Sequence, residues 1–588
     1  MKKVLALLLT GLLTGSAWAQ TGVAVPELAH CDELIEQFRQ RWKIPGVSVA
    51  ISRHGRLVYA RGFGHADLAR TVPMQPHHQL RVASVSKPVT AVAVLKLAED
   101  GRLDLDHRVF GPEGYLTAPY YNEVIRDERI YDITLRQLLE HSAGWNRNAG
   151  MDGFASSDPI EFPLHVTESL QVPNPVGDST LLRFMLGKGL DFRPGSRFAY
   201  SNVGYLVLGK VLEKVTGQSY ATWVRQQVLA PAGVREAHLG RNLLADKLPY
   251  EAEYFSKSSA LSCYGTGEQV PLPYGGRNLE AMSAHGGWVF SARDLVRFML
   301  AVDGSPSRPD LLTPASVASM VEPSEQNRRY AKGWMVTKDR VRWHTGALDG
   351  TASCVATNSE GYTWAILLNG RPAPNRFWNE LEDLGWDCIG GSNNWPTFDL
   401  MPPTEPVSRL RYAPVAAPDA ARLSWRKGNG SHRLVLLREG SPVDVLPQEG
   451  RSYAASSVFG LGAGLGHDTF VVGAGADTAL TVSNLKPGHA YYLSVFEYQQ
   501  TDATGQQPVY AFEGHARLQF NQPVPAVLAK AHTKQVKKSS RSRQATAGNR
   551  RKAQPDRPVA APETTAPTDY MAWLREKSRG IRRWLSGS

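Results

Sequence analysis

The chain has 588 residues, of which 42% are hydrophobic, enough for ordinary globular cores and for two or more domains. Its formal charge is +11, and residues 521–588 alone hold 15 Lys and Arg against 4 Asp and Glu, so the difference 15 − 4 = +11 equals the whole imbalance. The remainder is near neutral, which excludes the broad basic footprint of a nucleic-acid-binding protein.

Residues 1–19 have the pattern of a secretory signal. Lys2 and Lys3 form the basic start, residues 4–13 the apolar run, and residues 17–19 a small-residue cleavage site. The apolar run is too short to span a bilayer, and no later run reaches about 18 apolar residues. We therefore expect an exported, soluble protein that is periplasmic or secreted.

Helix and strand patterns alternate through residues 26–398. Helices are predicted at 26–42, 84–100, 133–139, 204–216, 291–298 and 377–389, and strands at 46–52, 57–64, 333–336, 341–346, 353–357 and 362–368. This order predicts an α+β domain in which an antiparallel sheet, flanked by helices, is split by a helical insertion. Residues 145–180, rich in Pro, Gly and Ser, are expected to wrap the surface as a long loop, and residues 240–282 to be irregular.

The pattern changes to period two after a proline-rich linker at 399–411. Residues 412–520 predict a β-sandwich. Within it, the sequence around Leu485, Pro487 and Tyr491 resembles the tyrosine corner of fibronectin type III domains. Residues 521–567 are basic and too poor in large apolar residues to fold.

Residues 568–586 predict an amphipathic helix. Tyr570, Trp573 and Trp584 share an apolar face, with Arg579 and Arg582 opposite. Such a helix suits an anionic membrane or cell-envelope surface, although the apolar face could instead pack back on the protein.

Ser84 and Lys87 stand three residues apart at the start of an apolar, helix-forming run. Residues i and i+3 share a helix face, so Ser84 Oγ and Lys87 Nζ can meet. A serine hydroxyl needs a base to become a nucleophile, and desolvation can lower the pKa of a lysine enough for that work. On this spacing alone, a capped surface helix explains the two residues better than a catalytic pair does.

Two further motifs follow in order. Tyr200 and Asn202 precede a helix, where an extended backbone would project both to one side. A tyrosine phenolate can act as a base if neighbouring cations lower its pKa. The sequence His-Thr-Gly at 344–346 lies on a predicted strand, where the glycine lets a substrate approach the backbone and the next residue can offer its N–H.

Together the three motifs resemble those of the serine β-lactamase and penicillin-binding superfamily. Tyr200 points to the class C branch, which includes D-alanyl-D-alanine carboxypeptidases, D-aminopeptidases and family VIII esterases. The resemblance spans about residues 26–395 and implies no metal and no cofactor. Because the first and last helices of this superfamily lie side by side, it favours Cys31–Cys388 if any disulfide exists.

The resemblance implies a role for each motif residue. Ser84 is the acylated nucleophile, and Lys87 and Tyr200 share the base work in a division that stays open. Asn202 holds the substrate amide, and the N–H groups of Ser84 and Ala347 form the oxyanion hole. The predicted catalytic residues are Ser84, Lys87, Tyr200, Asn202 and His344, and the predicted substrate-binding residues are Thr345, Gly346 and Ala347.

His344 stands where class C β-lactamases usually have lysine, and resembles the residue of some carboxypeptidases and esterases. The unperturbed pKa of histidine is about 6.5, so we expect a weaker grip on a substrate carboxylate and a pH dependence of substrate binding near pH 6–7. Arg342, on the same strand face, could supply a fixed charge, although an exposed strand arginine is the simpler interpretation.

The sequence therefore predicts an exported serine hydrolase that acts through an acyl-enzyme on amide or peptide substrates, with D-amino-acid-containing peptides first, as for a carboxypeptidase. A carboxylic-ester hydrolase and a class C-like β-lactamase are alternatives with the same chemistry. A penicillin-recognising or envelope-binding protein with negligible turnover is the alternative of another class. Besides a small-molecule or peptide substrate, the expected partner is an anionic membrane or envelope surface, and no nucleic acid is expected.

Overall fold

The computed structural model describes residues 20–306, 308–501, 507–512 and 514–524. Almost all of them belong to one compact unit, residues 1–523. The predicted signal, residues 1–19, and the predicted basic segment and amphipathic helix beyond residue 524 lie outside the described residues. In the part that the structure describes, every helix falls short of the length and apolar content needed to cross a bilayer.

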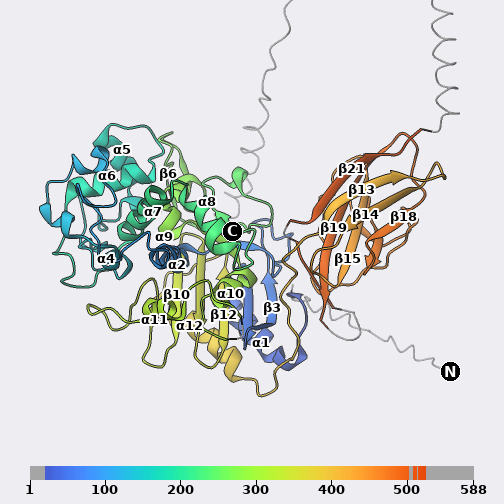
Figure 1. Ribbon diagram of the computed structural model, residues 1–588, viewed down its shortest axis with the longest axis horizontal. Helices are drawn as coiled ribbons and strands as arrows, with labels where there is room; N and C mark the ends of the chain where they lie inside the picture. Colours follow the sequence, from blue (N-terminus) through green and yellow to red (C-terminus); the bar gives the residue numbers. More distant parts are fainter. Residues whose placement is uncertain (1–19, 307, 502–506, 513, 525–588) are drawn as a thin grey trace, which may run out of the picture. The chain divides into compact units, whose positions relative to one another are not determined.

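An antiparallel sheet organises the first part of the described chain (Figure 1). Alternating β-branched residues such as Val47, Val49 and Ile51 help to build one of its buried faces. The strand order is β1-β3-β2-β12-β11-β10-β9, so the early strand β2 pairs with the late strand β12. This confirms the predicted split sheet. The strands are β1 (Gln20–Gly22), β2 (Gly46–Arg53), β3 (Arg56–Gly64), β9 (Met335–Val336), β10 (Arg342–Leu348), β11 (Thr351–Thr357) and β12 (Tyr362–Leu368).

Helices cover both faces of this sheet. On one face, α1 (Ala29–Arg41) and α12 (Asn375–Gly390) contact each other. Trp343 of β10 points to that face, where it contacts Glu382 of α12. Its neighbour Arg342 points the opposite way and donates to the carbonyl of Val302, two residues after the end of α10 (Ala292–Leu300). The sheet is therefore the middle layer between α1 and α12 on one side and α10 on the other.

The helical region between β3 and β9 carries the candidate site. Its long helices α2 (Ser86–Glu99) and α7 (Asn202–Thr216) contact each other and the short α9 (Ser283–Gly286). As predicted, Thr134 caps α4 (Leu135–Leu139), in a capping box with Gln137. The other helices are α3 (Pro119–Asn122), α5 (Pro163–Leu170), α6 (Asp178–Lys188), α8 (Tyr220–Val224) and α11 (Pro314–Val321).

Short elements fill the connections. The two small sheets are β4 (Gln79–Arg81), β8 (Trp288–Ser291) and β5 (His238–Leu239), and β6 (Ser259–Leu261) with β7 (Gln269–Pro271). The short helical turns are η1 (Pro26–Leu28), η2 (Ala83–Val85), η3 (Glu128–Asp132), η4 (Pro159–Glu161), η5 (Arg225–Leu229), η6 (Leu244–Asp246), η7 (Leu272–Gly276) and η8 (Leu279–Met282).

Residues 145–180 differ from the predicted surface loop. They contain η4, α5 and the start of α6, and Trp145, Asp158 and Ile160 are buried. The apolar side chains draw this segment into the core, and the polar ones enter the candidate site. The prediction of a surface loop is therefore corrected.

The four cysteines are buried free thiols. Cys31 of α1 and Cys388 of α12 are neighbours, with Cys31 Sγ donating to the carbonyl of Cys388 at 3.5 Å. The adjacency implied by the resemblance is present, but the favoured disulfide is not formed.

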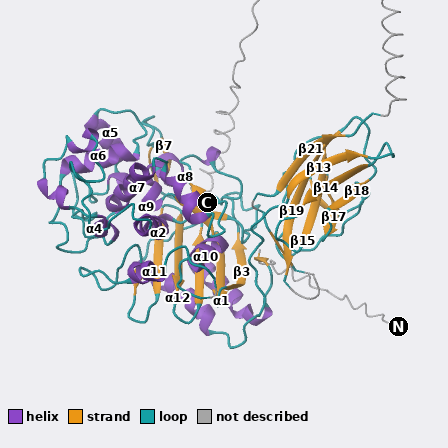
Figure 2. Ribbon diagram, viewed as in Figure 1, coloured by secondary structure: helices purple, strands orange, loops and turns teal. Residues whose placement is uncertain are grey.

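The last part of the described chain forms two antiparallel sheets that pack as a β-sandwich (Figure 2). One contains β13 (Ser408–Pro414), β14 (Ala421–Arg426) and β18 (Ala479–Val482). The other contains β16 (Gly464–Gly466), β17 (Thr469–Gly475), β15 (His432–Glu439), β19 (Ala490–Gln500), β20 (Pro508–Tyr510) and β21 (Ala516–Asn521). β13 begins inside the predicted linker and Gln522 is buried, so the sandwich extends past the predicted limits at both ends.

Candidate active site

Ser84 lies in the single turn η2, immediately before α2, rather than on the α-helix itself. The preceding residue, Ala83, has a φ of 49°, a left-handed conformation that is strained for a residue with a Cβ and that clusters at functional sites. Ser84 is partly exposed, whereas the helix behind it is buried. The turn therefore presents the hydroxyl at the surface of a rigid support.

Lys87 reaches Ser84 as predicted. Its side chain is fully buried, and Nζ donates to Ser84 Oγ at 3.1 Å and to the carbonyl of His285 at 2.8 Å. Burial, followed by the charge of Arg147, holds the pKa of Lys87 well below its usual value, although Asp158 acts in the opposite direction. Among the described residues no carboxylate forms an ion pair with Lys87, so this amine is favoured in its neutral, proton-accepting form.

Tyr200 also meets the nucleophile. Its hydroxyl is hydrogen-bonded to Ser84, and its ring lies 4.9 Å from Lys87 Nζ. Burial raises the pKa of Tyr200, and the hydrogen bond to Ser84 and the charge of Arg147 only partly oppose this. The condition for a phenolate base, a pKa lowered by neighbouring cations, is therefore not met at Tyr200, because desolvation outweighs them.

Asn202 is the first residue of α7, not part of an extended segment with Tyr200. Ser201 supplies the helix cap, accepting from Gly204 N, while its own N–H donates to His141 Nδ1. Asn202 Nδ2 donates to Asp158 Oδ2 at 2.5 Å. The helix start, rather than strand alternation, fixes Asn202 in the site.

Strand β10 forms the opposite wall. Gly346 lies directly against the carbonyl of Val82, two residues before Ser84, and Ser353 of β11 donates to the same carbonyl at 2.8 Å. A side chain at 346 would strike this backbone. The glycine therefore lets β10 and the nucleophile turn approach each other, while Thr345 is half-buried and Ala347 is exposed.

His344 is buried on β10. Burial, followed by the charge of Lys87, lowers the pKa of His344 to about 3, against a weaker opposing hydrogen bond with Thr345. This corrects the expectation of a titration near pH 6–7: the ring is neutral across that range. Tyr330 OH lies 3.5 Å from His344 Nε2.

Arg342 does not supply the fixed charge considered for it. It is 5% exposed, and its guanidinium donates to the carbonyl of Val302 and lies 5.7 Å from the Trp334 ring. The simpler interpretation, an exposed strand arginine, is wrong as well, because the side chain is buried and donates to the carbonyl of Val302.

Two residues of the site, Arg147 and Asp158, were not predicted from the sequence; both lie within the segment 145–180. The Arg147 guanidinium lies 5.9 Å from the Tyr200 ring, and its charge acts on the pKa of Lys87. Asp158 is 1% exposed and caps η4 at Pro159. An Asp-Pro pair signals a helix start, but nothing in a single sequence places that start beside Asn202.

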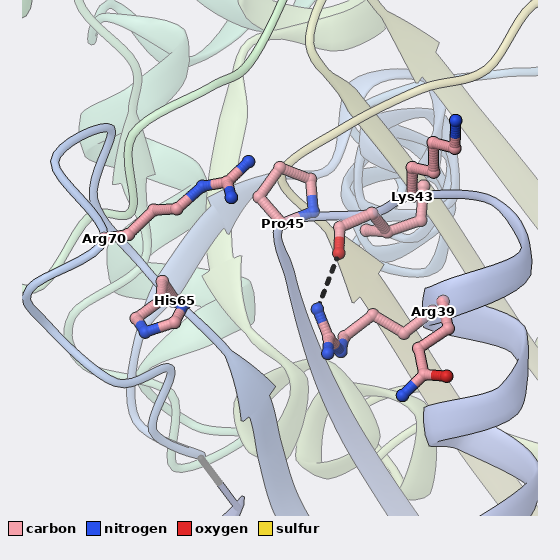
Figure 3. A pocket seen from close by; sticks show the side chains of 7 residues that line it. Arg39, Lys43, Pro45, His65 and Arg70 are labelled. Atoms are coloured by element: carbon pink, nitrogen blue, oxygen red, sulfur yellow. Dashed lines mark hydrogen bonds between the residues drawn. The ribbon is translucent and has the colours of Figure 1, made fainter. Parts of the chain in front are cut away.

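A separate pocket of about 440 Å³ lies away from these residues (Figure 3). Arg39, Lys43, His65 and Arg70 line it. The Arg39 guanidinium is already held by Glu36 and the carbonyl of Ile44, and the Lys43 amine points away from Pro45. This pocket is outside the candidate site.

Comparisons with known proteins show what this chain is similar to. A family model described as Beta-lactamase matches residues 31–384, more than half of the chain. Protein flp of Staphylococcus aureus (strain MW2) is 27% identical over 356 residues, which are 58% of this chain and 62% of that protein, so the match spans less than two thirds of that relative. Penicillin-binding protein 4* of Bacillus subtilis (strain 168) is 25% identical over 436 residues, 72% of this chain and 86% of that protein. The solved D-amino acid amidase of Ochrobactrum anthropi SV3, in complex with L-phenylalanine, is 19% identical with a TM-score of 0.48, covering 62% of this chain and 99% of that one.

Proposed function

Because the chain belongs to the Beta-lactamase family, we propose that it hydrolyses an amide or peptide bond through an acyl-enzyme on Ser84, with D-amino-acid-containing peptides as the leading substrate class. The observation that carries this proposal is the hydrogen bond of 3.1 Å between Ser84 Oγ and the buried amine of Lys87. An amine whose pKa is lowered by burial can accept the serine proton near neutral pH.

The mechanism follows from the two pKa directions. Lys87 accepts the proton of Ser84, Oγ attacks the substrate carbonyl carbon, and the carbonyl oxygen becomes an oxyanion between the N–H groups of Ser84 and Ala347. The tetrahedral intermediate collapses as the leaving group departs with a proton that returns from Lys87 through the Tyr200 hydroxyl. Water then attacks the ester while Lys87 accepts its proton, and this proton passes to Ser84 Oγ as the bond to the acyl group breaks and the product acid leaves.

Tyr200 acts here as a hydrogen-bond relay. A phenol whose pKa is raised keeps its proton, so it is a poor base before the reaction begins. It can still donate its proton to the leaving group while it accepts another proton from Lys87. The proposal therefore gives the role of base to Lys87 and the role of proton carrier to Tyr200.

The neutral His344 bears on the choice between substrates. A ring whose pKa lies at about 3 offers a substrate carboxylate only a hydrogen bond, where a lysine would offer a charge. This favours a peptidase over an efficient class C-like β-lactamase, and it leaves a carboxylic-ester hydrolase as the first alternative. The alternative of another class is a penicillin-recognising or envelope-binding protein with negligible turnover.

We also propose three features that were expected from the sequence: export, binding of the tail to an anionic surface, and a fibronectin type III-like sandwich. Export through residues 1–19 and binding of the tail to an anionic membrane or envelope surface rest on the sequence patterns. A fibronectin type III-like identity for the sandwich is supported by Tyr491, whose hydroxyl accepts from the backbone N–H of Lys486 at 2.8 Å, and by the β13-β14-β18 sheet facing the β17-β15-β19-β21 strands.

Intact-mass measurement after exposure to a labelled penicillin tests the proposal. A stable adduct that is absent in Ser84→Ala supports a peptidase, and rapid release of hydrolysed drug supports a β-lactamase. No adduct on the wild-type protein, together with no Ser84-dependent hydrolysis of activated esters, would overturn the serine hydrolase assignment.

A further inference from the structure

Arg147 is a half-buried cation beside the nucleophile. Its guanidinium lies 5.9 Å from the ring of Tyr200, whose hydroxyl is hydrogen-bonded to Ser84. Among the described residues, this guanidinium forms no ion pair and no hydrogen bond. Arginine is well suited to bind a carboxylate, because its planar guanidinium offers paired N–H donors. An unpaired arginine beside a reactive serine is therefore a candidate binding group for an anionic part of the substrate.

The backbone fixes the base of this side chain. The carbonyl of Arg147 accepts from Ser156 Oγ and from the N–H of Ser157, both at 3.0 Å. The carbonyl of the preceding residue, Asn146, accepts from Ser157 Oγ at 2.6 Å, and its N–H donates to Asp191 Oδ2 at 2.7 Å. The loop is therefore already ordered around Arg147, so a ligand of the guanidinium does not have to order it.

The carboxylate of Asp158 lies near Arg147 but is occupied by other partners. Burial raises the pKa of Asp158, and the charge of Arg147 is the largest influence that opposes this rise. One oxygen, Oδ2, accepts from Asn202 Nδ2 at 2.5 Å, and the other, Oδ1, accepts from the N–H of Ile160 at 3.4 Å. Asp158 therefore marks the side of the site on which Arg147 lies, and it leaves the guanidinium donors free.

His344 lies on the other side of the site. The pKa of His344 depends on burial, on the charge of Lys87 and on a hydrogen bond with the next residue, whereas Arg147 has no effect on it. In the proposed peptidase reaction, His344 offers a hydrogen bond to a substrate carboxylate. In a carboxypeptidase substrate, that carboxylate belongs to the leaving amino acid. Arg147 therefore faces the other part of the substrate, the acyl part that stays bonded to the nucleophile.

Other cations around the site already have counter-ions. Lys332 forms an ion pair with Glu140 at 3.2 Å, and Arg277 forms one with Asp349 at 2.7 Å. These two cations are therefore neutralised by the protein itself. Arg147 differs from them because its counter-ion has to come from outside the described part of the chain.

The charge of Arg147 also affects the proposed base. Burial is the largest cause of the lowered pKa of Lys87, and the charge of Arg147 is the next. In the proposed mechanism Lys87 becomes a second cation when it accepts the serine proton. A carboxylate bound to Arg147 would stabilise these two cations, whereas a substrate ammonium would destabilise them. Binding and proton transfer thus both favour an anionic substrate over a cationic one.

We propose that Arg147 binds an anionic group, such as a carboxylate, on the acyl part of the substrate, and that the enzyme thereby selects acyl donors with a negative charge over neutral and cationic ones. This rests on the proposed serine hydrolase function and narrows its substrate class to acidic acyl donors. Arg147 is a specificity residue that contacts the substrate away from the reacting bond.

The test compares p-nitrophenyl esters of three acetylated dipeptides, in which D-alanine follows L-glutamate, L-glutamine or L-lysine. The leaving group is constant, so only the charge of the acyl part changes. Rates of p-nitrophenolate release near neutral pH are corrected with Ser84→Ala. We expect kcat/KM for the glutamyl ester to exceed that for the glutaminyl ester by about 10-fold or more. The lysyl ester should be slower than the glutaminyl ester by about threefold or more. An aspartyl and asparaginyl pair covers a carboxylate one methylene closer to the peptide backbone.

The variant Arg147→Gln isolates the role of the guanidinium. The preference for the acidic over the amide ester should fall to within about threefold, mainly through a higher KM for the acidic ester. Both esters should also slow together near neutral pH, because removing this charge raises the pKa of Lys87. The ratio cancels that effect, since one base serves both esters. Arg147→Lys keeps the cation and should retain a preference of at least about threefold.

A matched control and a second substrate pair complete the design. Arg422→Gln removes an exposed arginine of β14, so it changes the net charge equally and should leave the preference intact. The second pair keeps the glutaminyl acyl part and varies the leaving group, p-hydroxybenzoate against p-hydroxybenzamide, with the products separated by chromatography. Arg147→Gln should change both rates of this pair alike. Thermal unfolding of each variant shows whether the fold is kept.

Each outcome decides a different point. Wild-type ratios near one in both acidic and amide pairs, or a ratio retained in folded Arg147→Gln, overturn the selection by Arg147. A selective loss on the p-hydroxybenzoate ester in that variant overturns the assignment to the acyl part. No Ser84-dependent release from any of the esters instead refutes the proposed function itself.

Discussion

Two separate variants, Lys87→Met and Tyr200→Phe, should distinguish the proposed role of Lys87 as base from that of Tyr200 as proton relay. Methionine fills most of the volume of the lysine chain, which is fully buried and forms no ion pair among the described residues. Losing the general base should slow acylation of Ser84 by about 10²- to 10⁴-fold. Tyr200→Phe removes one hydrogen bond to Ser84, an effect of about 1–3 kcal/mol, or about 5- to 150-fold.

The assay is stopped-flow acylation by a fluorescent penicillin or an activated ester, from about pH 5 to pH 10. Because the pKa of Lys87 is lowered, the amine loses its proton below its ordinary value, and acylation should fall as the pH drops through this lowered pKa. That acid limb should persist in Tyr200→Phe and vanish in Lys87→Met. The opposite pattern, with the limb lost in Tyr200→Phe and kept in Lys87→Met, would refute the assignment of the base.

Stability gives an independent check with a defined sign. The folded state binds the Lys87 proton less tightly than the unfolded state, so between the lowered folded pKa and the ordinary value near 10.5 the unfolded chain carries more protons. The contribution of this residue to the free energy of unfolding therefore rises with pH across that window. Subtracting the pH dependence of Lys87→Met from that of the wild type should show this slope, and a difference that is flat with pH would contradict the lowered pKa.

Three further predictions concern the strand wall and the tail. His344→Gln should leave the pH dependence of kcat/KM unchanged between about pH 6 and 7, because the ring with a pKa of about 3 stays neutral there; a lost inflection would assign that titration to His344 after all. Gly346→Ala should lower the free energy of unfolding by about 1–3 kcal/mol and slow acylation, because its Cβ strikes the carbonyl of Val82. The control Gly390→Ala, which has open space around its Cβ, should be near neutral in the same denaturant titrations. Equal stability of the two variants would contradict the close approach of Gly346 to Val82. A chain ending at Pro523 should hydrolyse small soluble substrates normally but release anionic vesicles that the full chain binds at low salt, and equal vesicle binding would exclude the membrane proposal.

Local patterns were enough to predict the framework. Alternation of apolar and polar residues along 46–64 and 362–368 indicated strands, and Thr134 indicated the start of α4. These features are encoded within a few neighbouring residues, where propensity, capping and burial agree. The Ser84–Lys87 contact was predictable for the same reason, since one helical turn brings them together whether it is a 3₁₀ or an α turn.

The features of the site that could not be predicted from the sequence depend on contacts between distant segments of the chain. Burial among residues far away in the sequence raises the pKa of Tyr200 and lowers that of His344. The unperturbed pKa values of tyrosine and histidine do not indicate either shift. Arg342 looked like a surface residue because its neighbours on the strand do not reveal that it is buried against the carbonyl of Val302, 40 residues earlier in the chain. Asp158 belongs to a segment whose composition resembles a loop, and only the folded chain places it against Asn202.

The pairing of β2 with β12 also constrains how the chain can be made and handled. Val47 lies opposite Leu368 and Ile51 opposite Trp364, so the middle of the sheet cannot close until nearly the whole hydrolase region has left the ribosome. Contacts of such sequence separation form late and slowly. Until then the apolar edge of β2 has no partner strand, which is a template for association with other chains. Fragments that end before residue 362 should therefore aggregate, and the catalytic part expressed on its own needs to extend past α12.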